Sequence, residues 1–192
     1  MENRLLYGSE FYNGSEQGLE YEAVKLLKEN NLLLSCAESC TGGLLCKRIT
    51  EVSGASDVFE CGIISYANKI KHELLFVEEE MLRKYGAVSF AVAAQMAKGA
   101  LIRAKSDIAV SITGIAGPNS DNTNKKVGLV YVSLYDKNGN VFVKELNLNA
   151  PKDKVRQYNR YVSSSEALSL VIDYIENRLP MQPYDEFMRK FC

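Results

Sequence analysis

A serine in a short turn is the feature of this sequence that points most directly to chemistry. An apolar run beginning at Leu33 ends in small polar residues around Ser39, and two glycines follow at Gly42 and Gly43. This order is typical of a strand, a tight turn and the start of a helix. Such a turn can hold a nucleophile at the end of the strand and leaves backbone N–H groups free to bind a developing oxyanion. Ser39 is therefore the candidate nucleophile.

The same turn also has a purely structural interpretation. Ser and Thr are common N-caps of helices, and glycine readily adopts positive φ, so Ser39 or Thr41 could serve only as a cap. A serine hydroxyl is a weak nucleophile until a base takes its proton. The catalytic hypothesis therefore requires a base from elsewhere in the chain.

Two adjacent residues are candidates for that base. His72 is the only histidine, and no obvious orienting aspartate accompanies it in the sequence. Lys71 can act as a base only if its pKa falls from about 10 towards neutrality. We expect it in the first turn of a helix capped by Asn68, where the helix dipole and the charge of Lys69 both lower that pKa. Tyr66, at the end of the preceding strand, could relay the proton, although solvated lysines and a core tyrosine would also fit this spacing.

A second turn of small residues follows another predicted strand, at Thr113–Pro118 (TGIAGP). In α/β folds such turns gather at one edge of the sheet, where ligands bind. Two of them at one edge would form a cleft. In isolation the segment is equally typical of a structural crossover loop.

The apolar periodicity indicates the elements that must position these turns. Strands alternate with helices early in the chain, and a hairpin appears late, which favours an α/β sandwich with a mixed sheet in a single domain. We expect a flexible arm over residues 1–14, the domain over 15–180 and a charged peripheral tail over 181–192. The predicted helices cover 15–30, 44–53, 69–76, 78–85, 89–105 and 152–178, and the predicted strands cover 32–36, 58–67, 107–113, 127–135 and 141–147.

Composition limits the classes of function. The formal net charge of −1 argues against a nucleic-acid binder that works by neutralising phosphates. We expect no membrane association, because no window approaches the roughly 20 apolar residues of a membrane span. The first residues lack the apolar core of a signal peptide, so we expect a cytoplasmic protein. The five cysteines form no C-x-x-C pair, which predicts reduced thiols and no metal site.

Five segments together resemble the family of the CinA C-terminal domain, the nicotinamide-nucleotide amidases. They occur in the family's order and span about residues 19 to 178. One such segment would be weak evidence, whereas the series of five is specific. They are Ala37–Gly43 (AESCTGG), Tyr66–Lys71 (YANKIK), Gly86–Ser89 (GAVS), Thr113–Pro118 (TGIAGP) and Val127–Tyr131 (VGLVY).

The resemblance implies hydrolysis of the carboxamide of nicotinamide mononucleotide to nicotinic acid mononucleotide and ammonia. It implies a three-layer α/β/α sandwich with no metal and no cofactor, and we expect a homo-oligomer, a dimer or larger. The family's nucleophile matches Ser39, its lysine matches Lys71, and its tyrosine and threonine match Tyr66 and Thr113. The expected substrate-binding residues are Cys40, Thr41, Gly42, Gly43, Gly114, Ile115, Ala116, Gly117 and Arg156, the last from an R-x-x-x-R pattern at the start of the final helix.

The chain also departs from the family pattern. Residues 119–122 (NSDN) replace a usual glycine run, Asp121 would repel a phosphate, and Lys154 stands where glycine is usual. The departures keep two alternatives open. One is a catalytically silent pyridine-nucleotide-binding regulatory module. The other is a thiol hydrolase that uses Cys40 with Glu38 and Lys71.

Overall fold

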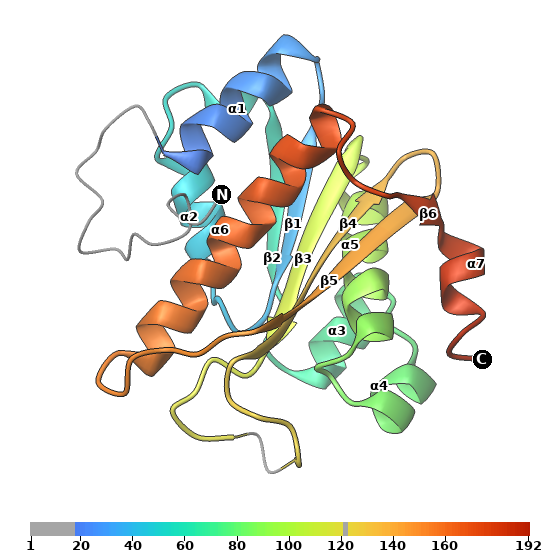
Figure 1. The fold of residues 1–192 in the computed structure, drawn as a ribbon. Helices are drawn as coiled ribbons and strands as arrows, with labels where there is room; N and C mark the ends of the chain where they lie inside the picture. The colour runs from blue at the N-terminus through green and yellow to red at the C-terminus, as the bar shows by residue number, and fades with distance from the viewer. Residues whose placement is uncertain (1–17, 121–122) are drawn as a thin grey trace.

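A six-stranded sheet forms the centre of the computed structural model, which describes residues 18–120 and 123–192 (Figure 1). The expected arm over residues 1–14 lies outside the described residues. The strand order is β2-β1-β3-β4-β5-β6. The strands are β1 Leu34–Glu38, β2 Phe59–Ile64, β3 Ile108–Gly114, β4 Leu129–Asp136, β5 Asn140–Asn147 and β6 Gln182–Pro183. The α-helices are α1 Leu19–Glu29, α2 Leu44–Thr50, α3 Asn68–Leu75, α4 Glu79–Tyr85, α5 Phe90–Ala104, α6 Val155–Ile175 and α7 Tyr184–Met188, with a 3-10 turn at Ala55–Asp57.

The sheet is mixed, as predicted. Strand β1 pairs in parallel with both β2 and β3, and the remaining neighbours are antiparallel. All five residues of β1 are buried, as expected for a strand covered on both faces. Because β1, β2 and β3 run the same way, their carboxyl ends meet at one edge of the sheet. Glu38 pairs there with Ile64 on one side and Ile112 on the other.

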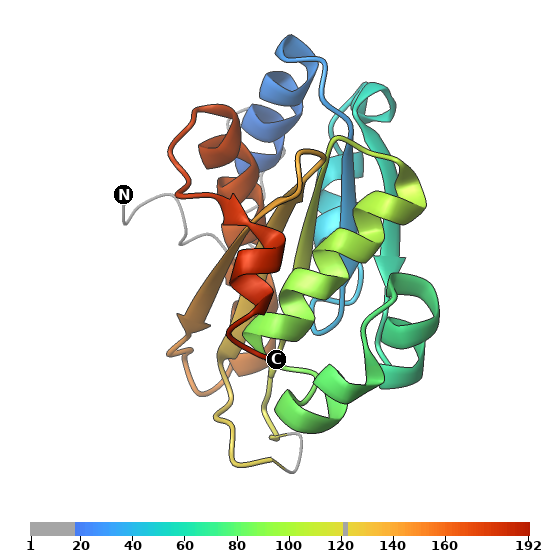
Figure 2. The same cartoon turned by 90° about the vertical axis from the view of Figure 1, so that its right-hand side faces the viewer.

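Helices cover both faces, which confirms the predicted three-layer α/β/α sandwich. Apolar side chains of α1, α2 and α6 share one core cluster with the sheet, and those of α3, α4, α5 and α7 share the other. Figure 2 shows α5 lying along the second face. A Cβ on Gly99 of α5 would lie 2.0 Å from the Leu75 carbonyl oxygen, so this glycine lets α3 approach closely. Within the described residues, no helix has the length and apolar character needed to cross a membrane.

The C-terminal segment corrects one expectation. Residues 181–192 are not a peripheral tail, because β6 extends the sheet edge and α7 packs against the second face. Tyr184, Phe187 and Met188 are all buried. The charged residues between and after them face outwards and hide this apolar stripe in the sequence, where five helical residues are too few to show a clear period.

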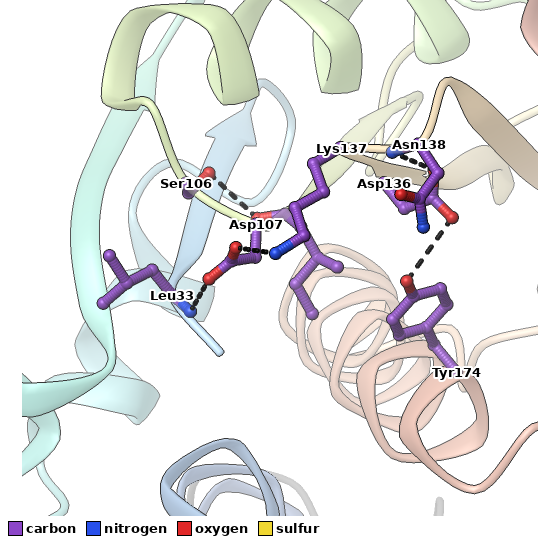
Figure 3. Close-up of polar contacts among 8 residues, drawn as sticks. Leu33, Ser106, Asp107, Asp136, Lys137, Asn138 and Tyr174 are labelled. Carbon is purple, nitrogen blue, oxygen red and sulfur yellow. Dashed lines mark hydrogen bonds and ion pairs between the residues drawn. The ribbon is translucent and has the colours of Figure 1, made fainter. Parts of the chain in front are cut away.

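Hydrogen bonds to two carboxylates stabilise the hairpin end of the sheet, where β4 turns into β5 (Figure 3). This end lies opposite the carboxyl ends of β1 to β3. Asp107 accepts the backbone N–H of Leu33 at 2.8 Å and the ammonium of Lys137 at 2.7 Å. Buried Asp136 begins the β4–β5 turn, and its hydrogen-bond donors in the described part of the chain are all uncharged. These donors are the Asn138 N–H at 3.0 Å, the Asn140 N–H at 2.8 Å, the Asn140 side-chain amide at 3.2 Å and the Tyr174 hydroxyl at 3.4 Å.

Candidate active site

Ser39 and Lys71 meet at the carboxyl edge of the parallel strands. The Lys71 Nζ donates to Ser39 Oγ at 3.0 Å, although the residues are 32 positions apart. Ser39 directly follows β1, whereas Lys71 lies in the first turn of α3, which follows β2. Since β1 and β2 are parallel neighbours, the segments after them emerge side by side. The fold therefore joins the two residues that the sequence analysis singled out.

The surroundings of Lys71 suit a base. Its side chain is 1% exposed, and Nζ also donates to the Ser65 carbonyl at 2.5 Å. No carboxylate among the described residues forms an ion pair with this ammonium. Burial lowers the pKa of Lys71 to about 8. A neutral amine in this place keeps one N–H on the Ser65 carbonyl and offers its lone pair to the Ser39 hydroxyl proton.

Glu38 shapes the turn that presents Ser39. Its fully buried carboxylate accepts three backbone N–H groups at the start of α2, from Gly43 at 2.9 Å, Leu45 at 3.3 Å and Cys46 at 2.8 Å. These donors are the ones that a helix N-terminus leaves without intrahelical partners. Gly43 has φ of 92°, which glycine adopts without steric cost. Glu38 is therefore a positioning residue that fixes the chain on both sides of the nucleophile.

The same bonds limit which backbone groups can serve as oxyanion donors. The Gly43 N–H is held by Glu38, the Gly42 N–H donates to the Ser39 carbonyl at 3.1 Å, and the Ser39 N–H donates to Ile112. Within the described part of the chain, the N–H groups of Cys40 and Thr41 have no other residue as acceptor. The predicted run of donors from 40 to 43 thus narrows to these two.

Helix α6 forms hydrogen bonds with the nucleophile turn, residues 39–43, which carries Ser39. Arg160 donates to the Thr41 carbonyl through Nε at 3.0 Å and through Nη2 at 2.6 Å. Gly42 has φ of 58°, a left-handed conformation that glycine adopts without steric cost. In the sequence, Arg160 is the second arginine of the R-x-x-x-R pattern that begins at Arg156. That spacing of about one helical turn places both arginines on one face.

The neighbouring residues of α6 hold the second turn. Asn159 donates to the Ala116 carbonyl at 3.1 Å, and Arg156 Nη1 donates to the Gly117 carbonyl at 3.0 Å. Arg156 Nη2 lies 3.3 Å from the hydroxyl of Tyr66, which accepts its proton. Helix α6 therefore forms hydrogen bonds with both turns. Arg156 lies between the second turn, at Gly117, and the segment after β2, at Tyr66.

Tyr66 does not occupy the relay position that the spacing suggested. Its side chain is 65% exposed and its hydroxyl faces Arg156, whereas Lys71 reaches Ser39 directly. The Ser65 carbonyl, one residue earlier in the chain, holds the buried amine, whereas Tyr66 itself is exposed. The third group at the amine is therefore the backbone carbonyl of Ser65, which no side-chain pattern in the sequence could have indicated.

Thr113 lies beside the nucleophile without contacting it. The register that pairs Glu38 with Ile112 brings the next residues, Ser39 and Thr113, to neighbouring positions at the strand ends. Thr113 is buried, and its Oγ1 donates to the Ala87 carbonyl at 2.7 Å. The hydroxyl proton is thus committed to the segment before α5, and Thr113 ties that segment to the site.

The other predicted binding residues of the second turn act through their backbone. Ile115 and Ala116 are buried. Gly117 has φ of 80°, and a Cβ on Gly114 would lie 2.6 Å from the Val130 side chain. These positions give the turn its shape and aim its carbonyls at α6.

The thiol alternative loses support from the geometry. Cys40 is 6% exposed, and burial raises the pKa of its thiol to about 12. A thiol with that pKa is protonated near neutrality and is a poor nucleophile. Glu38, its suggested partner, is committed to three backbone donors. Among the described residues, no group of three or more His, Cys, Asp or Glu side chains could hold a metal ion.

Comparison with known proteins finds relatives that match most of this chain. A CinA-like protein of Kosmotoga olearia is 42% identical over 172 residues, covering 90% of this chain and 40% of that protein. A CinA-like protein of Dictyoglomus turgidum is 43% identical over 157 residues, covering 82% of this chain and 38% of that protein. The chain thus spans about two fifths of the length of these curated relatives.

A solved structure gives the same result in three dimensions. The crystal structure of the competence/damage inducible protein CihA from Agrobacterium tumefaciens superposes with a TM-score of 0.77 at 38% identity, covering 82% of this chain and 93% of that one. Residues 16–175 match the family model of the CinA C-terminal domain, which is most of the chain. The chain therefore belongs to the CinA C-terminal domain family.

Proposed function

We propose that this protein is a serine amidase that hydrolyses the carboxamide of nicotinamide mononucleotide. The observation that carries the proposal is the contact between a buried lysine without an ion-pair partner and the hydroxyl of Ser39. A Ser–Lys pair of this kind supports acyl transfer, because the lysine can exist as a neutral amine near physiological pH. The choice of substrate rests on the resemblance to the nicotinamide-nucleotide amidases.

Acylation begins when neutral Lys71 takes the proton of Ser39. The serine oxygen attacks the carboxamide carbon, and the negative charge that forms on the carbonyl oxygen is stabilised by the N–H groups of Cys40 and Thr41. One well-placed donor of this kind contributes about 3 kcal/mol to transition-state stabilisation. The resulting ammonium of Lys71 returns its proton to the departing nitrogen, and ammonia leaves.

Deacylation repeats these roles with water. The acyl group remains on Ser39 Oγ, and Lys71, neutral again, takes a proton from the attacking water. The second tetrahedral intermediate uses the same two N–H donors. Its collapse releases nicotinic acid mononucleotide and restores the Ser39 hydroxyl.

Two exposed groups at the site suit the rest of the substrate. Arg156 keeps further N–H groups beyond those on Gly117 and Tyr66, and a guanidinium is well matched to phosphate oxygens. The pyridine ring of the nucleotide carries a positive charge, and the exposed ring of Tyr66 can attract it through a cation–π contact. Tyr66 then orients the substrate rather than relaying a proton.

The test is ammonia release from nicotinamide mononucleotide, with the acid product identified by chromatography. Ser39→Ala and Lys71→Ala should abolish release, and Lys69→Ala should not, since the Lys69 side chain is 77% exposed on the same helix. Binding of the mononucleotide by calorimetry with no turnover would replace the amidase by a silent binding module. Turnover that survives both site variants would refute the mechanism.

A further inference from the structure

Two cysteines outside the proposed mechanism meet behind the nucleophile turn. Cys36 lies in β1, three residues before Ser39, and Cys46 lies in the first turn of α2. The Cys46 sulfur sits over Gly62 of β2, because a Cβ built on that glycine would lie 2.3 Å from it. Gly62 is the cross-strand partner of Cys36. Neighbouring strands are about 4.8 Å apart, so the Cys46 sulfur, which lies over Gly62, is beside Cys36 on the adjacent strand.

Both thiols belong to the same face of the sheet. Cys36 is part of the core under α1, α2 and α6, and Cys46 packs against that core. Cys61 is different, because it pairs with Ser35 and so points to the opposite face, as does Ile63 in the other cluster. A bond between Cys46 and Cys61 would have to cross the sheet. The chain thus offers one pair that can be joined and one nearby thiol as a matched control.

We propose that Cys36 and Cys46 form a reversible disulfide under oxidation by a peroxide, which makes this pair a redox modification site. Cys46 is partly exposed and reacts first, whereas Cys36 is fully buried. Cys46 loses its thiol proton, the thiolate attacks one peroxide oxygen and the O–O bond breaks, which gives a sulfenic acid and a hydroxide that takes up a proton to become water. The Cys36 sulfur then attacks the sulfenic sulfur, the S–S bond forms and the S–O bond breaks, releasing a second water. The two thiols lose two electrons, which reduce the peroxide.

The modification reaches the candidate site through Glu38. A disulfide bond of about 2.05 Å is shorter than any non-bonded contact between two sulfurs, so its formation draws the start of α2 towards β1. The Cys46 N–H donates to Glu38 Oε1, and Glu38 also holds the Gly43 N–H. Movement of Cys46 therefore alters the bonds that fix the turn around Ser39. This consequence rests on the proposed amidase function, whereas formation of the disulfide does not.

The experiment treats the full chain with hydrogen peroxide, alkylates the remaining free thiols and maps the linked peptides by mass spectrometry. The expected product is a Cys36–Cys46 disulfide that dithiothreitol reverses. In an active preparation the rate of ammonia release falls by about tenfold or more, because small displacements at a site are costly, and it recovers on reduction. Cys61→Ala should behave like the unsubstituted chain, whereas Cys36→Ala and Cys46→Ser should each lose the linkage and the response to peroxide.

Each variant is compared with itself before and after oxidation, so a change in its basal rate does not enter the result. A linkage to Cys61, or irreversible oxidation of Cys46 with no linkage, would overturn the site. A mapped Cys36–Cys46 linkage in an active preparation whose rate stays constant would overturn the coupling through Glu38. A linkage in a chain with no amidase activity would support the modification site and count against the proposed function alone.

Discussion

The two ends of the sheet treat side-chain charge in opposite ways. At the hairpin end, Asp107 is held by the Lys137 ammonium and a backbone N–H (Figure 3). Burial raises the pKa of Asp107, but these hydrogen bonds outweigh it and the net pKa is lowered. At the other end, buried Lys71 has a hydroxyl and a carbonyl as its hydrogen-bond acceptors among the described residues, and burial lowers its pKa to about 8. The paired end contributes stability, whereas the unpaired end holds a charge that is easily lost as a proton.

The comparison also separates two buried carboxylates that do the same local work. Glu38 and Asp136 each accept several backbone N–H groups at a turn. Asp136 closes a hairpin, and Glu38 fixes the turn that carries Ser39. A buried carboxylate that accepts backbone N–H groups therefore stabilises a turn at each end of the sheet. At the end that carries Ser39, it also positions the candidate nucleophile.

The largest expected effect is the loss of ammonia release when Ser39 or Lys71 is replaced, with little change when Lys137 is replaced. Ser39→Ala removes the nucleophile and Lys71→Ala removes the base, so we expect kcat for ammonia release to fall by about 10³-fold or more in each. Lys71→Arg should fail equally, because a guanidinium does not deprotonate at accessible pH. Lys137→Ala at the hairpin end should stay within about twofold of the parent rate. A similar loss in Lys137→Ala would mean that the two ends are not functionally distinct.

Replacing Glu38 and Asp136 by the corresponding amides tests whether the two buried carboxylates have the same structural role. Glu38→Gln and Asp136→Asn both replace an acceptor oxygen by a donor group facing N–H groups. We expect each to lower the free energy of unfolding by about 2–4 kcal/mol, measured by urea denaturation. At temperatures where both variants remain folded, only Glu38→Gln should reduce kcat. Equal kcat in the two variants would contradict a positioning role for Glu38.

Replacing the buried lysine by an apolar side chain should stabilise the fold. A pKa lowered from 10.5 to about 8 corresponds to about 3 kcal/mol at pH 7, and Lys71→Met removes that cost while ending activity. Below about pH 8 the lysine is charged in both states, so the gain is full. Between pH 8 and 10.5 the unfolded chain binds the extra proton, the parent gains stability as pH rises, and the advantage of Lys71→Met shrinks. Urea denaturation at pH 7 and pH 10 measures both limits.

The rate of ammonia release by the parent chain should depend on the protonation state of Lys71. Only the neutral amine accepts the Ser39 proton, so kcat/KM should rise about fiftyfold from pH 6 to pH 8 and level off above that. Steady-state ammonia release in a constant-ionic-strength buffer series measures the profile. A rate that is flat from pH 6 to pH 9 would show that Lys71 is not the base.

Sequence patterns located most of the elements because their apolar periods are regular. The strands that became β1 and β3, and the long helices α5 and α6, carry clear signals, and the small-residue turns after β1 and β3 mark the edge where the site forms. The meeting of Ser39 with Lys71 was expected from the family resemblance, since spacing alone favoured solvated lysines. Only the parallel pairing of β1 with β2 brings these two segments together.

The rest depended on groups that leave little trace in the sequence. The Ser65 carbonyl is available at any residue type, so nothing marked it as a partner of Lys71. The spacing suggested a relay because Tyr66 lies five positions before Lys71, but the chain turns between β2 and α3 and Tyr66 is exposed. The segment 181–192 looked like a solvated tail because a five-residue helix is too short to display its buried face.

The smallest expected effect lies in the surface pair at the hairpin end. The Lys137 side chain is 59% exposed, and exposed ion pairs contribute little, so Lys137→Ala should lower stability at pH 7 by less than about 1 kcal/mol. The lowered pKa of Asp107 adds stability above the ordinary pKa of an aspartate, and that stability is lost as pH falls through the folded-state value. The parent and Lys137→Ala should therefore converge in acid, whereas the parent and Lys71→Met converge only in alkali. Denaturation curves of the three chains across the acid and alkaline ranges separate the two cases, because an ion-pair contribution that grew as pH fell could not come from the Asp107 carboxylate and its ammonium.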